Sequence, residues 1–198
     1  MPEYTEAAAL QLIDHAFAEA RRRAGDWIEC RSGCSDCCYC PFAITAADAR
    51  RLRHGLHELQ TRDPGAADAI RNSATALWRR MEVDFPGDHA TGSLTPSETW
   101  RDWFLDRHSG VACPVLDEAT GSCRLYEHRP AACRLYGPLF QIGGHVTAPC
   151  PKNYRGATPA DFEACRVTLD AACFQEPATE AETVIAFACA APKIPGDP

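Results

Sequence analysis

Twelve cysteines stand out in this chain of 198 residues, and most of them fall into two dense groups. The first group is Cys30-Arg-Ser-Gly-Cys34-Ser-Asp-Cys37-Cys38-Tyr-Cys40. The C-x2-C spacing of Cys34 and Cys37 lets a tight turn direct two sulfurs at one metal, with backbone amides free to bond to them. Adjacent Cys37 and Cys38 suit one mononuclear metal poorly because neighbouring side chains diverge. A polynuclear cluster, or two centres, suits them better, and Cys30 could close the site from the other side.

The second group consists of Cys113, Cys123, Cys133 and Cys150. Cys113 and Cys123 lie on opposite arms of a predicted hairpin, so we expect them to approach each other. Cys133 falls near the start of a short helix that Pro130 opens, where helix-terminal amides and nearby cations favour thiolate over thiol. Three arginines surround these positions and are expected to balance the negative charge of a thiolate-bound centre: Arg124, Arg129 and Arg134.

The two groups together predict a metal centre held by cysteine thiolates. The predicted ligands are Cys30, Cys34, Cys37, Cys38, Cys113, Cys123, Cys133 and Cys150. Ligation by thiolates alone excludes magnesium and calcium, which prefer oxygen. The adjacent cysteines and the spare thiolates favour an iron–sulfur cluster, with 4Fe-4S as the first choice. Zinc (Zn2+) stays the alternative, because eight cysteines can also form two four-cysteine sites.

Three later cysteines are interpreted differently. Cys165, Cys173 and Cys189 recur with apolar residues at helix spacing, and a buried free cysteine behaves as a small hydrophobe. We therefore expect them to belong to the core, whereas Cys40 stays ambiguous. No catalytic residue is assigned from the sequence.

Other uses of clustered cysteines have less support. Thiol–disulfide oxidoreductases carry C-x2-C after a strand in a βαβ context, which the sequence does not indicate. Structural disulfides require an oxidising compartment. Residues 1–14 show no basic segment, apolar segment and cleavage site in series, so a cytoplasmic location is expected. We also expect no membrane span, because no run of about 18 apolar residues occurs.

The charge balance bears on partners. The formal net charge is −7 and no basic block interrupts it, which makes nucleic acid an improbable partner. A protein partner or a protein substrate remains open.

Hydrophobic periodicity and capping signals predict a mainly helical chain. Helices are predicted over residues 5–24, after the cap Thr45, and after the break at residues 63–65. A fourth, short helix is predicted to start at Thr95-Pro96-Ser97-Glu98 and to bury Trp100, Trp103 and Phe104.

The remaining segments are predicted as follows. Hairpins are expected over residues 111–125 and 139–147, and residues 85–93 are expected to form a loop. The tail over residues 159–190 is predicted to form two helices joined near Pro177.

These elements predict a mainly α fold: a small helical domain with one or two short β-hairpins around a cysteine-rich metal-binding loop. We divide the chain into an N-terminal helix (1–27), a cysteine-cluster metal-binding domain (28–155) and a C-terminal helical extension (156–198).

The cysteine pattern resembles the YkgJ-type cysteine-cluster (CxxCxxCC) family of zinc- or iron-chelating domains. The first half of the match is Gly33-Cys34-Ser-Asp-Cys37-Cys38, followed by Phe42, Ile44, Thr45 and Ala49. The second half is Cys113-Pro114-Val115-Leu116, Cys123, Tyr126, Arg129-Pro130, Cys133-Arg134 and Tyr136. Both halves occur in order over roughly residues 28–150, and the resemblance implies metal binding.

The resemblance leaves the biological role open. Some relatives look like lysine N-methylases that carry an iron–sulfur cluster, but the sequence shows no glycine-rich methyl-donor loop. A cluster-dependent protein-modifying enzyme and a zinc-stabilised protein-interaction module are therefore alternatives to a structural or electron-carrying metal protein.

Overall fold

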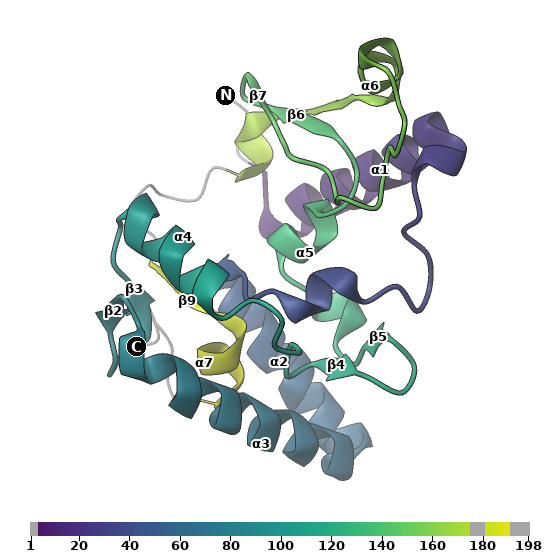
Figure 1. The fold of residues 1–198 in the computed structure, drawn as a ribbon. Coiled ribbons are helices and arrows are strands. Elements are labelled where there is room, and N and C mark those ends of the chain that lie inside the picture. Colours follow the sequence, from purple (N-terminus) through teal and green to yellow (C-terminus); the bar gives the residue numbers. More distant parts are fainter. Residues whose placement is uncertain (1–3, 175–180, 191–198) are drawn as a thin grey trace. The chain divides into compact units, whose positions relative to one another are not determined.

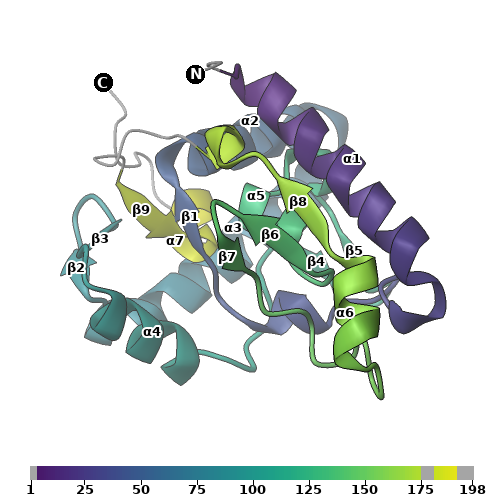
Figure 2. The same ribbon diagram turned by 90° about the horizontal axis from the view of Figure 1, so that it is seen from above.

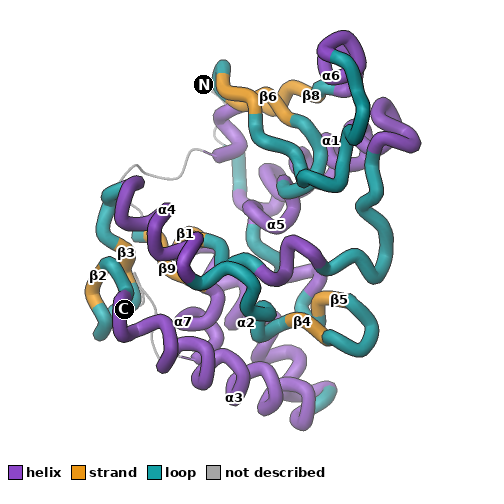
Figure 3. Tube along the Cα trace, viewed as in Figure 1, coloured by secondary structure: helices purple, strands orange, loops and turns teal. Residues whose placement is uncertain are grey.

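The computed structural model of the chain describes residues 4–174 and 181–190. The chain forms two compact units, and each draws on separate parts of the sequence. The first unit comprises Met1–Cys34 and Cys133–Ala178, and the second comprises Ser35–Ala132 and Thr179–Pro198. Helices dominate both units (Figure 3), which confirms the mainly α class. The three segments expected from the sequence stay a prediction.

A long helix packed on a small sheet makes up the first unit. Its helical elements are α1 (Glu6–Ala24), η1 (Gly25–Trp27), α6 (Pro159–Cys165) and η5 (Ala171–Phe174). Its strands are β6 (Phe140–Ile142), β7 (His145–Val146) and β8 (Val167–Leu169). Strand β6 lies in the middle, antiparallel to β7 and parallel to β8. Helix α1 runs alongside β8 (Figure 2).

The sequence explains why α1 forms and which face it buries. The Thr5 hydroxyl accepts the Ala8 N–H at 3.3 Å and caps the first turn, while arginines occupy the last turn. Ala16 and Ala20 lie one turn apart and pack against the sheet. Their sheet partners are Phe140, Val167 and Leu169.

The second unit is built on three helices that contact one another, α2 (Ala46–Arg62), α3 (Pro64–Met81) and α7 (Ile185–Ala190) (Figure 1). Its other helical elements are η2 (Asp36–Tyr39), η3 (Glu82–Asp84), α4 (Glu98–Arg107) and η4 (Tyr126–His128). Its strands are β1 (Ala43–Thr45), β2 (Gly87–Asp88), β3 (Ser93–Leu94), β4 (Leu116–Asp117), β5 (Ser122–Cys123) and β9 (Glu182–Val184). The short helix α5 (Ala131–Leu135) spans the boundary between the units.

Side-chain caps define the ends of α2 and α3. The Thr45 hydroxyl accepts the Asp48 N–H at 3.1 Å, as the sequence predicts. The Asp63 carboxylate accepts the Ala66 N–H at 3.0 Å, and Pro64 occupies the first turn of α3. The predicted break at residues 63–65 therefore also starts the next helix.

Long-range packing fixes α7 against α2 and α3. Strand β9, which precedes α7, pairs with β1 in the register Ala43↔Val184. The Phe187 ring meets the Trp78 ring edge-on, with 4.9 Å between centroids. Gly92 has φ +68° and lies against the Phe187 ring, where a side chain would clash.

Several details differ from the sequence-based expectations. The predicted hairpins are confirmed as β4–β5 and β6–β7, but a third hairpin, β2–β3, occupies the predicted loop. The predicted cap, Thr95, is two residues early, because Ser97 is the N-cap and α4 begins at Glu98. Trp100 and Trp103 are 58% and 44% exposed, so their predicted burial is wrong, while Phe104 is buried.

The C-terminal segment from residue 159 also differs from its prediction as two helices. Its first predicted helix ends at Cys165, and the chain continues as β8, so Leu169 is a strand residue. Strand formation depends here on pairing with β6, a partner that local periodicity does not reveal. Cys173 lies in the turn η5, and the predicted joint at Pro177 lies outside the described residues. Among the described helices, none has the length and apolar character needed to cross a bilayer.

Gly55 tests the packing of α2 against η4. A Cβ at this position would lie 2.5 Å from the His128 ring, whereas a Cβ at Gly65 would meet only an Asp63 oxygen at 3.6 Å. We expect Gly55→Ala to lower the free energy of unfolding by about 1–3 kcal/mol, because the ring must shift. Gly65→Ala, the matched control, should change it by less than about 1 kcal/mol. Urea denaturation measures both, and equal values for the two variants would contradict this packing.

Candidate metal centre

The first cysteine stretch is shaped by two consecutive turns. Gly33 has φ +84°, a conformation that favours glycine, and the Cys34 N–H bonds to the Arg31 carbonyl at 3.0 Å. In the second unit, η2 follows, with the Cys38 N–H donating to the Ser35 carbonyl at 2.8 Å. These local bonds hold the cysteine backbone without a regular helix or strand.

The second cysteine stretch is hydrogen-bonded directly to η2. The Cys113 N–H donates to the Cys38 carbonyl at 2.6 Å, and the Gly110 N–H donates to the Tyr39 carbonyl at 2.6 Å. Two short backbone bonds therefore hold residues 110–113 beside η2. The predicted approach of the two stretches is realised here for Cys38 and Cys113.

The β4–β5 hairpin brings Cys123 back beside the segment that follows Cys113. Strands β4 and β5 pair Leu116 with Cys123, and the Leu116 N–H bonds to the Cys113 carbonyl at 3.0 Å. Gly121, at φ +68°, allows the tight turn between the strands. The expectation that Cys113 and Cys123 occupy opposite arms of one hairpin-like segment is thus confirmed in outline, with Cys113 just before β4.

The thiols of the second unit influence one another. A hydrogen bond with Cys38 and burial raise the pKa of Cys37 far above its ordinary value. Burial raises the pKa of Cys113 to about 12, and the charges of Cys123, Cys189 and Cys37 raise it further. Burial also raises the pKa of Cys123, as does Cys37. The Cys113 thiol is therefore within electrostatic reach of Cys37, Cys123 and Cys189, and the Cys37 thiol is within reach of Cys38.

A backbone N–H and a guanidinium partly offset the effect of burial on the pKa of Cys123. The Leu125 N–H and the Arg129 guanidinium both lower the pKa of Cys123, against the effect of burial. The Arg129 guanidinium lies 3.8 Å from the Tyr126 ring centroid, which holds it in a cation–π contact. Of the three arginines predicted to balance charge, Arg129 acts on a predicted ligand, Cys123.

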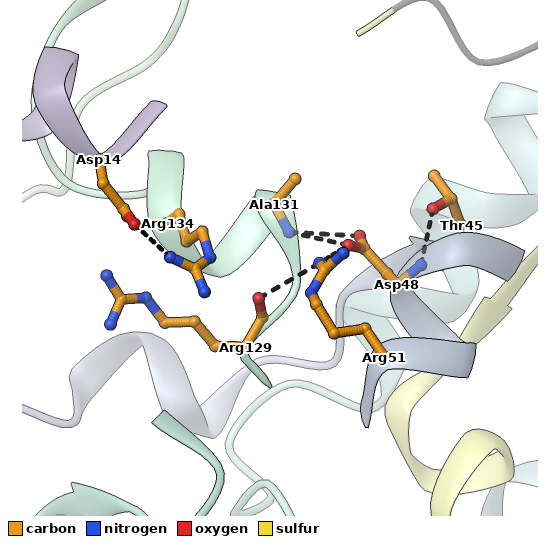
Figure 4. A network of polar contacts seen from close by, with 7 residues as sticks. All are labelled: Asp14, Thr45, Asp48, Arg51, Arg129, Ala131 and Arg134. Carbon is orange, nitrogen blue, oxygen red and sulfur yellow. Dashed lines mark hydrogen bonds and ion pairs between the residues drawn. The ribbon is translucent and has the colours of Figure 1, made fainter. Parts of the chain in front are cut away.

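The other two arginines face carboxylates. Arg124 lies 3.4 Å from Asp117 in the β4–β5 hairpin. Arg134, in the first unit, is buried and forms an ion pair with Asp14 of α1 (Figure 4). Their predicted role beside the sulfurs stays a prediction.

A buried carboxylate connects α2 to the segment that follows Cys123. Asp48 is 4% exposed and accepts the Ala131 N–H at 3.1 Å. It also pairs with Arg51, whose guanidinium donates to the Arg129 carbonyl at 3.3 Å (Figure 4). A single turn of α2 thereby fixes residues 129–131, close in sequence to the cysteines on either side.

In the first unit, the Asn153 side chain hydrogen-bonds to residues around Cys30 and Cys150. The Asn153 amide donates to the Gly137 carbonyl at 2.7 Å and to the Cys30 sulfur at 3.5 Å. Its oxygen accepts the Glu29 N–H at 3.0 Å. The Cys150 N–H donates to the same Gly137 carbonyl at 3.0 Å.

Gly137 permits this close approach. It has φ +122°, and a Cβ there would lie 2.9 Å from the Cys30 sulfur. Sequence reasoning missed both Asn153 and Gly137, because neither belongs to a metal-ligand pattern. Asn153 was detectable only as a polar residue three positions after Cys150.

The eight predicted ligands divide evenly between the units. Cys37, Cys38, Cys113 and Cys123 belong to the second unit, and Cys30, Cys34, Cys133 and Cys150 to the first. Cys34 and Cys133 are half-buried residues at the unit boundary, and their ligand role stays a prediction. Cys40 is exposed as a residue. Partial burial of its thiol raises its pKa, and the charges of Asp106 and Cys37 raise it further.

The donor set fits a thiolate-bound metal in its chemistry. None of the twelve cysteines, all within the described ranges, forms a disulfide. Within those same ranges, no three His, Cys, Asp or Glu side chains meet at the spacing of a completed metal site. The second unit nevertheless brings soft sulfur donors from both stretches together, and such donors select zinc and iron–sulfur clusters.

The family comparison agrees with this chemistry. Residues 29–151 match the model of the CxxCxxCC family, described as a "putative zinc- or iron-chelating domain". The chain belongs to this family. All eight predicted ligands lie inside the CxxCxxCC match, while Cys165, Cys173 and Cys189 lie outside it. No curated protein and no solved structure shows significant similarity to the chain.

Asn153 provides a test of the first unit's cysteine neighbourhood. Asn153→Asp keeps the oxygen that accepts the Glu29 N–H but removes the N–H that Gly137 and Cys30 receive. We expect a loss of about 1–3 kcal/mol in the free energy of unfolding, because the Gly137 carbonyl loses one of its two donors and a carboxylate replaces a buried amide. Asn72→Asp on the exposed face of α3 is the control and should be nearly neutral. Similar unfolding curves for the two variants would refute this role of Asn153.

Proposed function

We propose that the protein holds an iron–sulfur cluster through cysteine thiolates from its two cysteine-rich stretches. The observation that carries the proposal is the convergence of Cys37 and Cys38 with Cys113 and Cys123 in one unit, tied by the bond from Cys113 N to Cys38 O. Membership of a family of chelating domains supports metal binding as such. When bound, a cluster supplies a structural or electron-carrying centre, and zinc is the alternative occupant.

Residues of the second unit would hold such a centre in different ways. Cys113 and Cys123 offer sulfurs from a turn and a hairpin, where the backbone is already fixed. The Leu125 N–H and Arg129 stabilise negative charge on Cys123. Partial burial raises the pKa of Cys113, so a bound cation would supply the charge that stabilises its thiolate form.

Anaerobic purification tests the identity of the centre. We expect a brown protein with visible absorption, an electron-paramagnetic signal on reduction, and bound iron and sulfide by elemental analysis. Cys113→Ser and Cys123→Ser should lose most of this absorption, because each removes a half-buried sulfur donor of the convergent set. Cys165→Ser should retain it, since Cys165 belongs to the core of the first unit. A colourless protein with stoichiometric zinc would replace iron with zinc in the proposal, and a protein without metal would overturn it.

A small cavity lies beside Cys113 in the second unit. Apolar side chains of α3, β9 and α7 line it, together with Cys40 and His108. Its volume is about 20 Å³, which is room for roughly one water molecule. This cavity does not accommodate an amino-acid side chain, so it does not favour the protein-modifying enzyme.

A metal-stabilised interaction module is the second candidate, and α4 favours it. Trp100 and Trp103 are exposed and meet edge-on, with 5.7 Å between centroids, and the Arg107 guanidinium lies 5.5 Å from the Trp103 centroid. Tryptophan and arginine are the residues most enriched where binding energy concentrates in protein interfaces.

The tryptophan pair gives this candidate its own test. Replacing Trp100 and Trp103 by alanine should abolish binding of any stoichiometric protein partner while leaving the metal content unchanged. Val83→Ala, at a position 83% exposed outside α4, is the control and should bind as the parent protein does. Undiminished partner binding by the double variant would exclude α4 as the interface.

A further inference from the structure

Helix α4 presents two adjoining rows of side chains to solvent. Trp100, Trp103 and Arg107 are three and four residues apart, so they form one row along the helix. Asp102 and Asp106 are four residues apart and form a second row beside the first. All five residues are exposed. Aromatic and acidic groups therefore lie next to each other on one face of α4.

Contacts within α4 and with η3 order the aromatic row. The Trp100 and Trp103 rings meet edge-on, at 84° and with 5.7 Å between their centroids. The Arg107 guanidinium lies 5.5 Å from the Trp103 centroid and pairs with the Asp84 carboxylate. Both rings are thus positioned without being covered, so they lose little side-chain freedom when a partner contacts them.

The charge of this face is negative. The positive charge of Arg107 is offset by its carboxylate partner in η3. The Arg101 guanidinium is shared by two carboxylates, at 3.3 Å from Glu182 and 3.6 Å from Asp102. The Asp102 side chain is 72% exposed, and Asp106 has no ion-pair partner within residues 4–174 and 181–190. The formal net charge of the whole chain, −7, adds to the same sign.

One tryptophan ring of the pair already accepts a cation from this chain. The Arg107 guanidinium lies over Trp103, whereas no cation of the described residues lies over Trp100, the more exposed ring at 58%. Indole is the best aromatic acceptor for a lysine or arginine side chain. A cation placed over Trp100 also gains attraction from the carboxylates of the neighbouring row.

We propose that this face of α4 docks a basic segment of another protein, in which lysine or arginine stands beside apolar side chains. The apolar side chains contact the indole rings, one cation lies over Trp100, and others pair with Asp102 and Asp106. The proposal goes beyond the metal centre, which takes no part in it, and gives the interaction module a partner of stated chemistry.

Other occupants match the charge of this face less well. Nucleic acids and anionic lipids are negatively charged, so the acidic row repels them. A second copy of the chain brings the same acidic face and the same negative net charge. A basic protein segment gains from both rows.

A titration followed by the indole N–H resonances of the full chain tests the proposal. The probe is a short unstructured peptide of lysine, glycine and phenylalanine, and its counterpart carries glutamate in place of each lysine. Of the four tryptophans, we expect Trp100 and Trp103 to shift with the lysine peptide. Trp27 and Trp78 should not shift, because they pack inside the two units. The glutamate peptide should bind at least about 5-fold more weakly.

Variants separate the acidic row from the net charge of the chain. Asp102→Asn with Asp106→Asn should weaken binding of the lysine peptide about 3- to 10-fold, because two exposed ion pairs are lost. Asp68→Asn with Glu163→Gln removes the same charge from α3 and α6 and is the matched control, expected to bind within about 2-fold of the parent protein. Trp100→Ala should weaken binding about 10-fold, and Trp100→Phe should retain most of it.

Three results would each overturn the proposal: equal binding of the two peptides, equal weakening by the two double variants, or a titration that leaves Trp100 unshifted. Preference for the glutamate peptide, abolished by Trp100→Ala, would also overturn it and would assign an acidic partner to α4 instead. Metal content is measured in the same samples, so a failure of the proposed metal centre is distinguishable from a failure of this docking site.

Discussion

The burial of several sulfurs in one place is the constraint on which the second unit depends. A thiolate carries a charge that a low-dielectric interior does not accept without a counter-charge, and burial raises the pKa of Cys113, Cys123 and Cys189. The chain still uses one of its shortest backbone bonds, from Cys113 N to Cys38 O at 2.6 Å, to bring these groups together. A bound cation removes the conflict, because it replaces the protons and balances the charge. On this account, metal binding and folding of the unit are one process.

Helix α2 is connected to the first cysteine stretch through β1 and hydrogen-bonds to the segment that follows Cys123. It follows the first stretch through β1, and its N-terminal turn carries Asp48, which bonds to the Ala131 N–H after the second stretch. Two turns further along, Gly55 lies against the His128 ring. α7 then packs on α2 and α3 and is anchored by the β1–β9 pair. A helix with no cysteine of its own thus positions much of the thiolate set.

Local signals predicted much of this arrangement. Periodicity and the caps at Thr45 and Asp63 define α2 and α3, because these bonds join residues three apart. The cysteine pattern predicted the convergence of the two stretches. Pairings between distant residues were not predictable in the same way: β8 forms because β6 lies beside it, and Asn153 matters because Cys30 and Gly137 lie within its reach. The exposed Trp100 shows that large apolar residues do not by themselves predict burial.

The most direct test of a thiolate-held metal centre is X-ray absorption at the metal edge of the full chain, purified without oxygen. We predict bound iron or zinc with a first coordination shell of sulfur at about 2.3 Å. A shell made mainly of nitrogen or oxygen, or a protein with no bound metal, would contradict the account.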